Sequence, residues 1–161
     1  MLIRLTTEAD LPYLDAIFDA CRDYMAAQGN PTQWDANYPN SKLVAQDVID
    51  GTGYVCVDEN SGEILGTFAL GTFEGEYDRL QGGKWNYDEP YVVIHRLGTV
   101  SGRGVGSFIL SELQKQYPYI RVDTHEDNQT MLHLFDRFGF KYCGTVSYPG
   151  YGERVAYDYH S

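Results

Sequence analysis

Residues 91–113 read YVVIHRLGTVSGRGVGSFILSEL, and they contain the clearest structural pattern of the chain. The segment Tyr91 to Leu97 is apolar enough to form a central β-strand. Glycines follow at alternate positions, Gly102, Gly104 and Gly106, and a run with apolar residues at helical spacing comes next. A strand, a glycine-rich turn and a helix form a phosphate-binding arrangement, because glycines expose backbone N–H groups and the helix N-terminus carries partial positive charge.

The residues around the glycines exclude two common phosphate-binding motifs. The Walker motif requires a lysine between its last glycine and the hydroxyl residue, but Gly106 is followed directly by Ser107. The dinucleotide fingerprint requires a glycine three residues after its second one. Counted from Gly102 and Gly104, that position is again Ser107. The turn therefore either binds a different anion or only closes a tight connection.

Strands and helices alternate outward from this stretch in a pattern typical of an α/β protein. The expected strands are residues 1–5, 54–57, 64–70, 91–97, 119–124, 140–147 and 154–159. The expected helices are residues 11–25, 43–49 (capped by Ser41), 108–113 and 128–138. Residues 74–90 form a long polar and aromatic insert, which is typical of a lid, a binding loop or a disordered segment. This order predicts a single domain over residues 1–161.

Composition narrows the possible partners. The chain of 161 residues has 12 Lys and Arg against 23 Asp and Glu, a formal net charge of -11. Such acidity disfavours nucleic acid and anionic membranes as partners and mildly favours a cationic small molecule or peptide. Neither the three cysteines nor the four histidines have the spacing of a metal site. Because the cysteines also form no disulfide framework and no signal peptide is recognisable, we expect a cytoplasmic location.

Three segments together resemble the GNAT superfamily of N-acetyltransferases. Gly104 and Gly106 match the glycines of its Arg/Gln-x-x-Gly-x-Gly/Ala loop. Residues 128–140, NQTMLHLFDRFGF, resemble its last helix with the closing Gly-Phe, and residues 3–10, IRLTTEAD, its first strand and helix start. The resemblance implies an α/β fold with a mixed, mostly antiparallel central sheet, flanked by helices and splayed between the fourth and fifth strands.

The same resemblance implies acetyl-CoA as the co-substrate. The turn amides would hold its pyrophosphate, the backbone of Leu97 and Thr99 would pair with the pantetheine, and Asn128 would either contact the pantetheine or cap its helix. The family's Arg or Gln is replaced by Ser101, so Arg103 is expected to compensate in part. The expected cofactor-binding residues are Leu97, Thr99, Gly102, Arg103, Gly104, Val105, Gly106, Ser107 and Asn128.

Amine acetylation needs a general base, because a primary amine with a pKa of about 10.4 is neutral roughly once in 2,500 molecules at pH 7. Strand alternation predicts that Val93, His95 and Leu97 share one face. We expect His95 and Asp123 to act as a pair across neighbouring strands, with His125 as third candidate. The alternatives for His95 and Asp123 are a core histidine and a structural carboxylate.

The proton donor and the acceptor pocket are less clearly marked. Phe135 stands where many GNAT relatives carry a tyrosine acid, so the thiolate would be protonated by solvent or by another tyrosine such as Tyr142 or Tyr151. The acceptor pocket is expected to be aromatic and acidic, built from Trp34, Tyr77, Trp85 and Tyr87 together with Glu74, Glu76, Asp88 and Glu89. The alternatives are that the aromatic residues cover core edges and that the acidic residues are only solvated.

The predicted activity is direct transfer of acetyl from acetyl-CoA to a primary amine of a small molecule or peptide, because no cysteine lies near the glycine turn in the sequence. One alternative is a non-catalytic acyl-CoA-binding or sensor domain. It is motivated by Phe135, which cannot donate a proton, and by the short connection between the strand at 91–97 and the glycine-rich turn. Another is a regulatory domain that binds a nucleotide or phosphate. Aminoglycosides, polyamines, amino acids and protein N-termini all fit as acceptors, and the last strands offer an edge for a homodimer.

Overall fold

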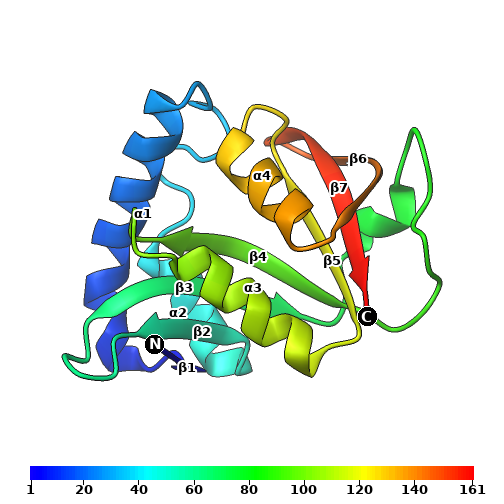
Figure 1. The fold of residues 1–161 in the computed structure, drawn as a ribbon. Coiled ribbons are helices and arrows are strands. Elements are labelled where there is room, and N and C mark those ends of the chain that lie inside the picture. Colours follow the sequence, from blue (N-terminus) through cyan, green and yellow to red (C-terminus); the bar gives the residue numbers. More distant parts are fainter.

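The computed structural model describes residues 1–161, and its elements follow the predicted order. The strands are β1 (Leu2–Leu5), β2 (Gly53–Val57), β3 (Ile64–Gly71), β4 (Val92–Thr99), β5 (Tyr119–Thr124), β6 (Lys141–Tyr148) and β7 (Gly152–His160). The α-helices are α1 (Leu11–Ala27), α2 (Ser41–Asp50), α3 (Val105–Gln116) and α4 (Gln129–Arg137), and short 3-10 helices span Glu8–Asp10 and Gly75–Arg79. The strands form one sheet in the order β1-β2-β3-β4-β5-β7-β6 (Figure 1). No helix is long and apolar enough to cross a membrane.

The sheet opens between β4 and β5, as predicted. All other neighbouring strands pair antiparallel, whereas β4 and β5 are parallel and pair only through Val92 with Ile120 and Val93 with Arg121. Beyond these two positions the strands diverge toward their carboxyl ends (Figure 1). The facing backbone edges of both strands are therefore free of interstrand hydrogen bonds at the opening.

A β-bulge reorients the second half of β4. Thr67 pairs with Gly98 and Ala69 pairs with His95, so β4 contains one extra residue between these pairs. Arg96 within it has a φ of 52°, which is uncommon for a residue other than glycine. The bulge breaks the strand alternation, and the prediction that Leu97 shares a face with Val93 and His95 is wrong. Leu97 instead packs with the cluster that contains Val92 and Ile94.

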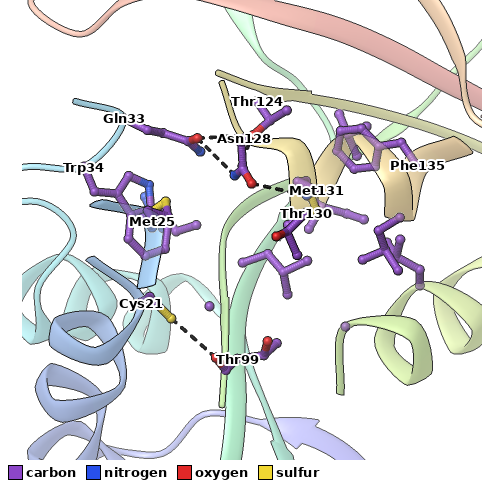
Figure 2. A pocket seen from close by; sticks show the side chains of 18 of the residues that line it. Cys21, Met25, Gln33, Trp34, Thr99, Thr124, Asn128, Thr130, Met131 and Phe135 are labelled. Carbon is purple, nitrogen blue, oxygen red and sulfur yellow. Dashed lines mark hydrogen bonds between the residues drawn. The ribbon is translucent and has the colours of Figure 1, made fainter. Parts of the chain in front are cut away.

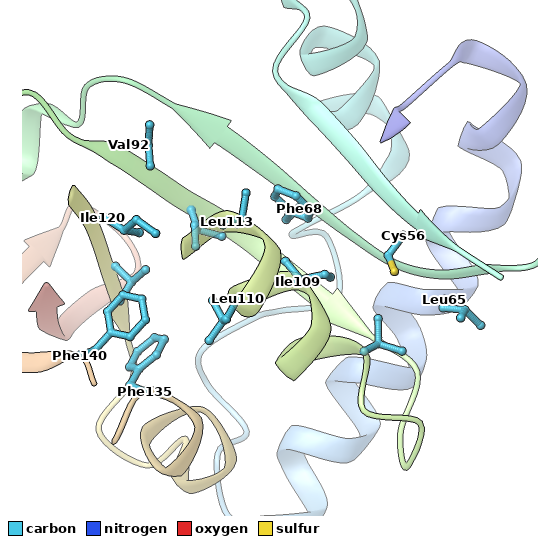
Figure 3. Packing of buried hydrophobic residues seen from close by; sticks show 13 residues of the cluster. Cys56, Leu65, Phe68, Val92, Ile109, Leu110, Leu113, Ile120, Phe135 and Phe140 are labelled. Carbon is cyan, nitrogen blue, oxygen red and sulfur yellow. The ribbon is translucent and has the colours of Figure 1, made fainter. Parts of the chain in front are cut away.

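Helices cover both faces of the sheet. One face packs against α3 and α4 through the largest hydrophobic cluster, in which Ile109 and Leu110 meet Val92, Ile120 and other strand residues (Figure 3). The other face packs against α1 and α2, where Phe18 and Val44 cluster with Val55 and Val57 of β2. Because the two layers use opposite faces of the same strands, the opening between β4 and β5 lies between them.

Much of the insert that follows β3 packs against the sheet. Its Gln81 forms a β-bridge with Thr145 of β6, so the insert lies against the β6 end of the sheet. Tyr77 from this insert is 1% exposed and packs with Val93 and Ala156 on the sheet face opposite α3. The segment therefore supports the core beneath the opening.

Candidate active site

A cavity of about 770 Å³ occupies the opening between β4 and β5. On one side it is lined by Cys21 and Met25 of α1 and by Trp34 of the following loop, and Asn128 and Met131 lie across from them (Figure 2). The cavity also reaches the glycine-rich turn on the α3 face and the second halves of β4 and β5. It therefore connects the two faces of the sheet.

The start of α3 has the free backbone donors that an anion requires. Gly102 and Gly104 have φ angles of 74° and 70°, a left-handed conformation that favours glycine. Gly104 is the N-cap of α3 and has no side chain to cap the following amides, so the N–H groups at the helix start are free. At α4, by contrast, Asn128 Oδ1 accepts the N–H of Met131 at 3.2 Å. The cavity therefore meets one uncapped helix N-terminus, that of α3.

Most residues predicted to bind the cofactor line the cavity. Arg103 is an exception, because its guanidinium group bonds to Glu63 at 3.0 Å and approaches Asp58 at 3.4 Å, both outside the cavity. The expectation that the Arg103 side chain replaces the missing arginine at position 101 is therefore wrong. The cavity residues from the predicted set are Leu97, Thr99, Gly102, Gly104, Val105, Gly106, Ser107 and Asn128.

Arg137 is a cation beside the turn that the sequence analysis did not identify. It lies in the last turn of α4, lines the cavity, and its Nη2 is 3.5 Å from Ser107 Oγ. His133, one turn earlier on α4, also lines the cavity. Residues four apart share one side of a helix, so both basic side chains face the start of α3.

Asn128 is occupied by contacts within the chain. Besides capping α4, it donates from Nδ2 to Gln33 Oε1 and to Thr124 Oγ1, both at 3.1 Å (Figure 2). Gln33 Oε1 also accepts from Asn30 Nδ2 at 2.8 Å. Asn128 therefore links the loop after α1 to the carboxyl end of β5. Of the two roles expected for it, the structure shows the helix cap.

His95 faces the cavity with a carboxylate beside it. Its Nε2 lies 3.3 Å from Oε1 of Glu74, a residue at the start of the insert, and both line the cavity. Glu74 is held in turn by the N–H of Glu76, which donates to Oε2 at 3.0 Å. The hydrogen bond with His95 is the main reason why the pKa of Glu74 lies below its usual value. The expected His95–Asp123 pair is wrong in this respect, since His95 pairs with Glu74.

Asp123 lines the cavity from β5 with two tyrosines behind it. Tyr77 and Tyr148 donate their hydroxyls to the same oxygen, Oδ2, at 2.6 and 2.7 Å. Burial raises the pKa of Asp123 above its usual value, and the two tyrosine hydrogen bonds oppose this shift. Burial also raises the pKa of both tyrosines, so both stay protonated and act as donors at neutral pH. Asp123 and His95 share no hydrogen bond or ion pair, but the charge of His95 also opposes the rise in the pKa of Asp123, so the two groups face the same part of the cavity.

His125 lies outside the cavity, and so do Tyr77 and Trp85, which were predicted to line the acceptor pocket. β5 ends at Thr124, so strand alternation does not place the His125 side chain on the face of Asp123. Instead, His125 Nδ1 accepts the N–H of Asp127 at 3.0 Å. Tyr77 lies behind Asp123. Trp85 donates to the carbonyl oxygen of Tyr77 at 2.9 Å and stacks on Arg121 at 4.3 Å. The placement expected for Tyr77 and Trp85 is therefore wrong, and both support the site from beneath.

The acceptor end of the cavity is closed by other aromatic residues. Trp34 lines it as predicted, and Tyr38 and Tyr151 approach each other at 4.9 Å between ring centroids. Of the two tyrosines considered as acids, Tyr151 lines the cavity, whereas Tyr142 is 54% exposed and lies elsewhere. Glu74 alone of the four predicted acidic residues lines the cavity; Glu76, Asp88 and Glu89 do not, and neither does Tyr87.

A cysteine lies closer to the site than the sequence spacing indicated. Cys21 of α1 lines the cavity, and its Sγ is 3.5 Å from the carbonyl oxygen of Thr99 (Figure 2). Burial raises the pKa of its thiol, which keeps it in the protonated form that does not attack a thioester. No group of three or more His, Cys, Asp or Glu side chains is arranged to hold a metal ion.

Comparison with solved structures identifies the fold class. The chain is similar to a GNAT-family acetyltransferase from Streptococcus agalactiae, with a TM-score of 0.87 and 29% identity over 99% of this chain and 95% of the other. No family model matches the sequence. The seven-stranded sheet with its single parallel pair is that of the GNAT acetyltransferases, so the resemblance expected from the three sequence segments is confirmed.

Two more distant structures share this fold. A phosphinothricin acetyltransferase from Sinorhizobium meliloti, solved in complex with acetyl-CoA, has a TM-score of 0.64 and 17% identity, covering 99% of this chain and 87% of that one. A ribosomal-protein-alanine N-acetyltransferase from Brucella melitensis has a TM-score of 0.64 and 21% identity over the whole of both chains. Their named acceptors differ, so the fold alone does not determine the acceptor of this chain.

Proposed function

We propose that this chain is an acetyl-CoA-dependent N-acetyltransferase that transfers acetyl directly to a primary amine. The observation that carries the proposal is the cavity between β4 and β5, which joins the uncapped start of α3 to the His95–Glu74 pair. The similar structures are acetyltransferases, and one of them was solved with acetyl-CoA, which supports acetyl transfer in general.

The cofactor half fits a diphosphate thioester. Free amides at the start of α3 and the partial charge of that helix would hold the pyrophosphate, and Arg137 would add a full positive charge beside them. The unpaired edge of β4 at Leu97 and Thr99 would bond to the amides of the pantetheine arm, as an added strand does. The thioester would then lie inside the opening.

On the other side of the opening, His95 is placed to act as the general base. A neutral amine would attack the thioester carbonyl carbon, so that a C–N bond forms, the C–S bond breaks and the amine loses a proton to His95 Nδ1, the ring nitrogen that does not bond to Glu74. Glu74 holds the imidazole in one orientation. The departing thiolate would take its proton from solvent or from Tyr151, because Phe135 cannot donate one. Asp123, with its raised pKa, is the second candidate for the base.

Cys21 supports direct transfer over an acetyl-enzyme intermediate. Its protonated thiol is a weak nucleophile, and the cavity contains no other cysteine. The proposal therefore needs acetyl-CoA and the amine to be bound together.

The test is release of CoA from acetyl-CoA in the presence of a panel of primary amines, with mass spectrometry of the acetylated product. The wild type should acetylate at least one amine, and His95→Gln should lower kcat by about 10²–10⁴-fold, the usual contribution of a general base. Binding of acetyl-CoA without transfer to any amine would contradict the proposal. That outcome would favour the acyl-CoA sensor, the alternative that Phe135 supports.

A further inference from the structure

Two arginines line the acceptor half of the cavity, although the acidic composition of the chain favoured a cationic acceptor. Arg96 is neutralised within the chain, because its Nη2 lies 2.5 Å from Oδ2 of Asp47. Arg154 of β7 forms no ion pair with any carboxylate. The two side chains therefore differ in whether their charge is available to a ligand.

Arg154 is held in place by neutral groups only. Its Nη1 donates to the carbonyl oxygens of Tyr151 at 2.7 Å and Glu153 at 3.0 Å, and its Nη2 donates to that of Gln33 at 3.1 Å. These bonds use three of the five guanidinium donors and leave Nε–H and one N–H of Nη2 without an acceptor. The only buried side-chain polar atoms that lack a partner are Thr6 Oγ1 and Asn30 Oδ1, so solvent reaches the free Nε–H of Arg154.

The strand register places this guanidinium on the same sheet face as the candidate catalytic groups. Asp123 of β5 pairs with Ala156 of β7, and Arg154 lies two residues before Ala156 on the same face. Diagonal neighbours of this kind are about 7–8 Å apart between strands. The separation suits a small molecule whose amine lies near Asp123 and His95 and whose second polar group lies near Arg154.

The environment of Arg154 disfavours an unpaired charge. The residue is 7% exposed, and burial lowers the pKa of its guanidinium from the usual value. The negative charge of Asp123 opposes this shift, so it compensates the buried cation in part. A buried cation without a directly paired anion is costly, and an anion bound in the cavity offsets the remaining cost. The planar guanidinium, with donors still free, matches a carboxylate in shape and charge.

We propose that Arg154 binds a carboxylate of the acceptor, so that the acceptor is a primary amine bearing a carboxylate, an amino acid or a close derivative. This inference rests on the proposed acetyl transfer and narrows its substrate class. The carboxylate would lie against the free donors of Arg154, and the amine would point through the opening toward the thioester. Polyamines and aminoglycosides offer no anion to this position.

The test compares matched acceptors on the wild-type protein. The standard amino acids, their carboxamides and the corresponding decarboxylated amines are assayed for CoA release from acetyl-CoA. At least one amino acid should show a kcat/KM about tenfold or more above its carboxamide and its decarboxylated amine, since a charge-assisted contact is lost in both. Equal or faster transfer to the carboxamide would overturn the inference and leave the proposed transferase activity intact.

Variants assign the preference to Arg154. Arg154→Gln should remove most of the preference for the carboxylate, measured as the ratio of kcat/KM for the amino acid to kcat/KM for its decarboxylated amine, and Arg154→Lys should keep part of the preference. Arg79→Gln is the matched control, because Arg79 is exposed, pairs with Glu76 and lies outside the cavity. A preference that survives in a folded Arg154→Gln protein would overturn the assignment.

A binding measurement separates the two proposals. Calorimetric titration of the wild type with the same amino acids and carboxamides, in the presence of CoA, does not require turnover. Selective binding of a carboxylate form without any transfer would support the anion site and contradict the transferase activity. If neither form binds and none is acetylated, both proposals are wrong.

Discussion

His95 Nε2 lies 3.3 Å from Glu74 Oε1, and this contact joins the central strand β4 to the insert that follows β3. The partners are 21 positions apart in the chain, and each lines the cavity between β4 and β5. A carboxylate in this position holds the imidazole in one orientation and fixes which ring nitrogen carries the hydrogen. The contact therefore gives His95 the environment that a general base needs.

Replacing Glu74 by Gln should lower kcat by about 10- to 100-fold, a part of the 10²–10⁴ that general base catalysis supplies. The affinity for acetyl-CoA should change little, because Glu74 lies on the acceptor side. Steady-state kinetics and calorimetry would measure both quantities. Glu76→Gln is the control, since Glu76 pairs with Arg79 and does not line the cavity. Equal activity of the two variants would count against the role of Glu74.

Arg137→Gln should weaken acetyl-CoA binding by about tenfold, the loss expected when one charge-assisted contact to a phosphate is removed. Arg103→Gln should leave the affinity nearly unchanged, although Arg103 lies inside the glycine-rich turn, because its side chain pairs with Glu63 and Asp58. Calorimetric titration of both variants with acetyl-CoA at the same ionic strength would measure the two affinities. A larger loss in Arg103→Gln would show that the cation beside the phosphates has been misassigned.

Asp123→Asn should abolish or strongly reduce activity if Asp123 is the base, yet it should stabilise the fold at neutral pH. Burial raises the folded-state pKa of Asp123, so the folded protein binds more protons than the unfolded chain and this group's contribution to stability falls as pH rises. Asn cannot ionise and can still accept the bonds from Tyr77 and Tyr148. Urea unfolding should show that the free energy of unfolding of the variant rises relative to the wild type as pH increases above about 4, the usual pKa of an Asp in an unfolded chain. A gain that shrinks with rising pH would contradict the assigned shift.

Cys21→Ala should retain acetyltransferase activity within a few fold, because direct transfer does not use the Cys21 thiol. Mass spectrometry of the wild type incubated with acetyl-CoA alone should find no acetylated Cys21. An acetyl group on this cysteine that is passed on to an added amine would show a two-step reaction instead.

The order and the type of the elements could be predicted because their signals are local. Apolar periodicity marks the helices and strands, and the glycines after β4 mark the turn. The second helix is capped by Asn40 rather than by the predicted Ser41, a difference of one position. The opening between β4 and β5 followed from the resemblance to a known fold and not from periodicity.

The polar contacts of the site could not be predicted in the same way. The bulged residues Arg96 and Leu97 are not glycines, and Gly98 beside them does not specify a bulge by itself, so strand alternation misplaced Leu97. Glu74 lies in a polar insert, and only the folded chain brings it to His95. Alternation along β7 places Arg154 on the same face as Ala156, which gives a weak indication that it lies near the site. Its hydrogen-bond partners could not be predicted, because they include a carbonyl oxygen on a distant segment, that of Gln33.

The most direct measurement is calorimetric titration of the wild type and of Gly104→Glu with acetyl-CoA, with ATP as the control ligand. Gly104 has a φ of 70° at the uncapped start of α3, so a glutamate there strains the turn and places negative charge against the phosphates. Acetyl-CoA should bind the wild type in preference to ATP, and Gly104→Glu, still folded, should lose this binding. Absence of wild-type binding up to millimolar acetyl-CoA would contradict the proposed acetyl transfer.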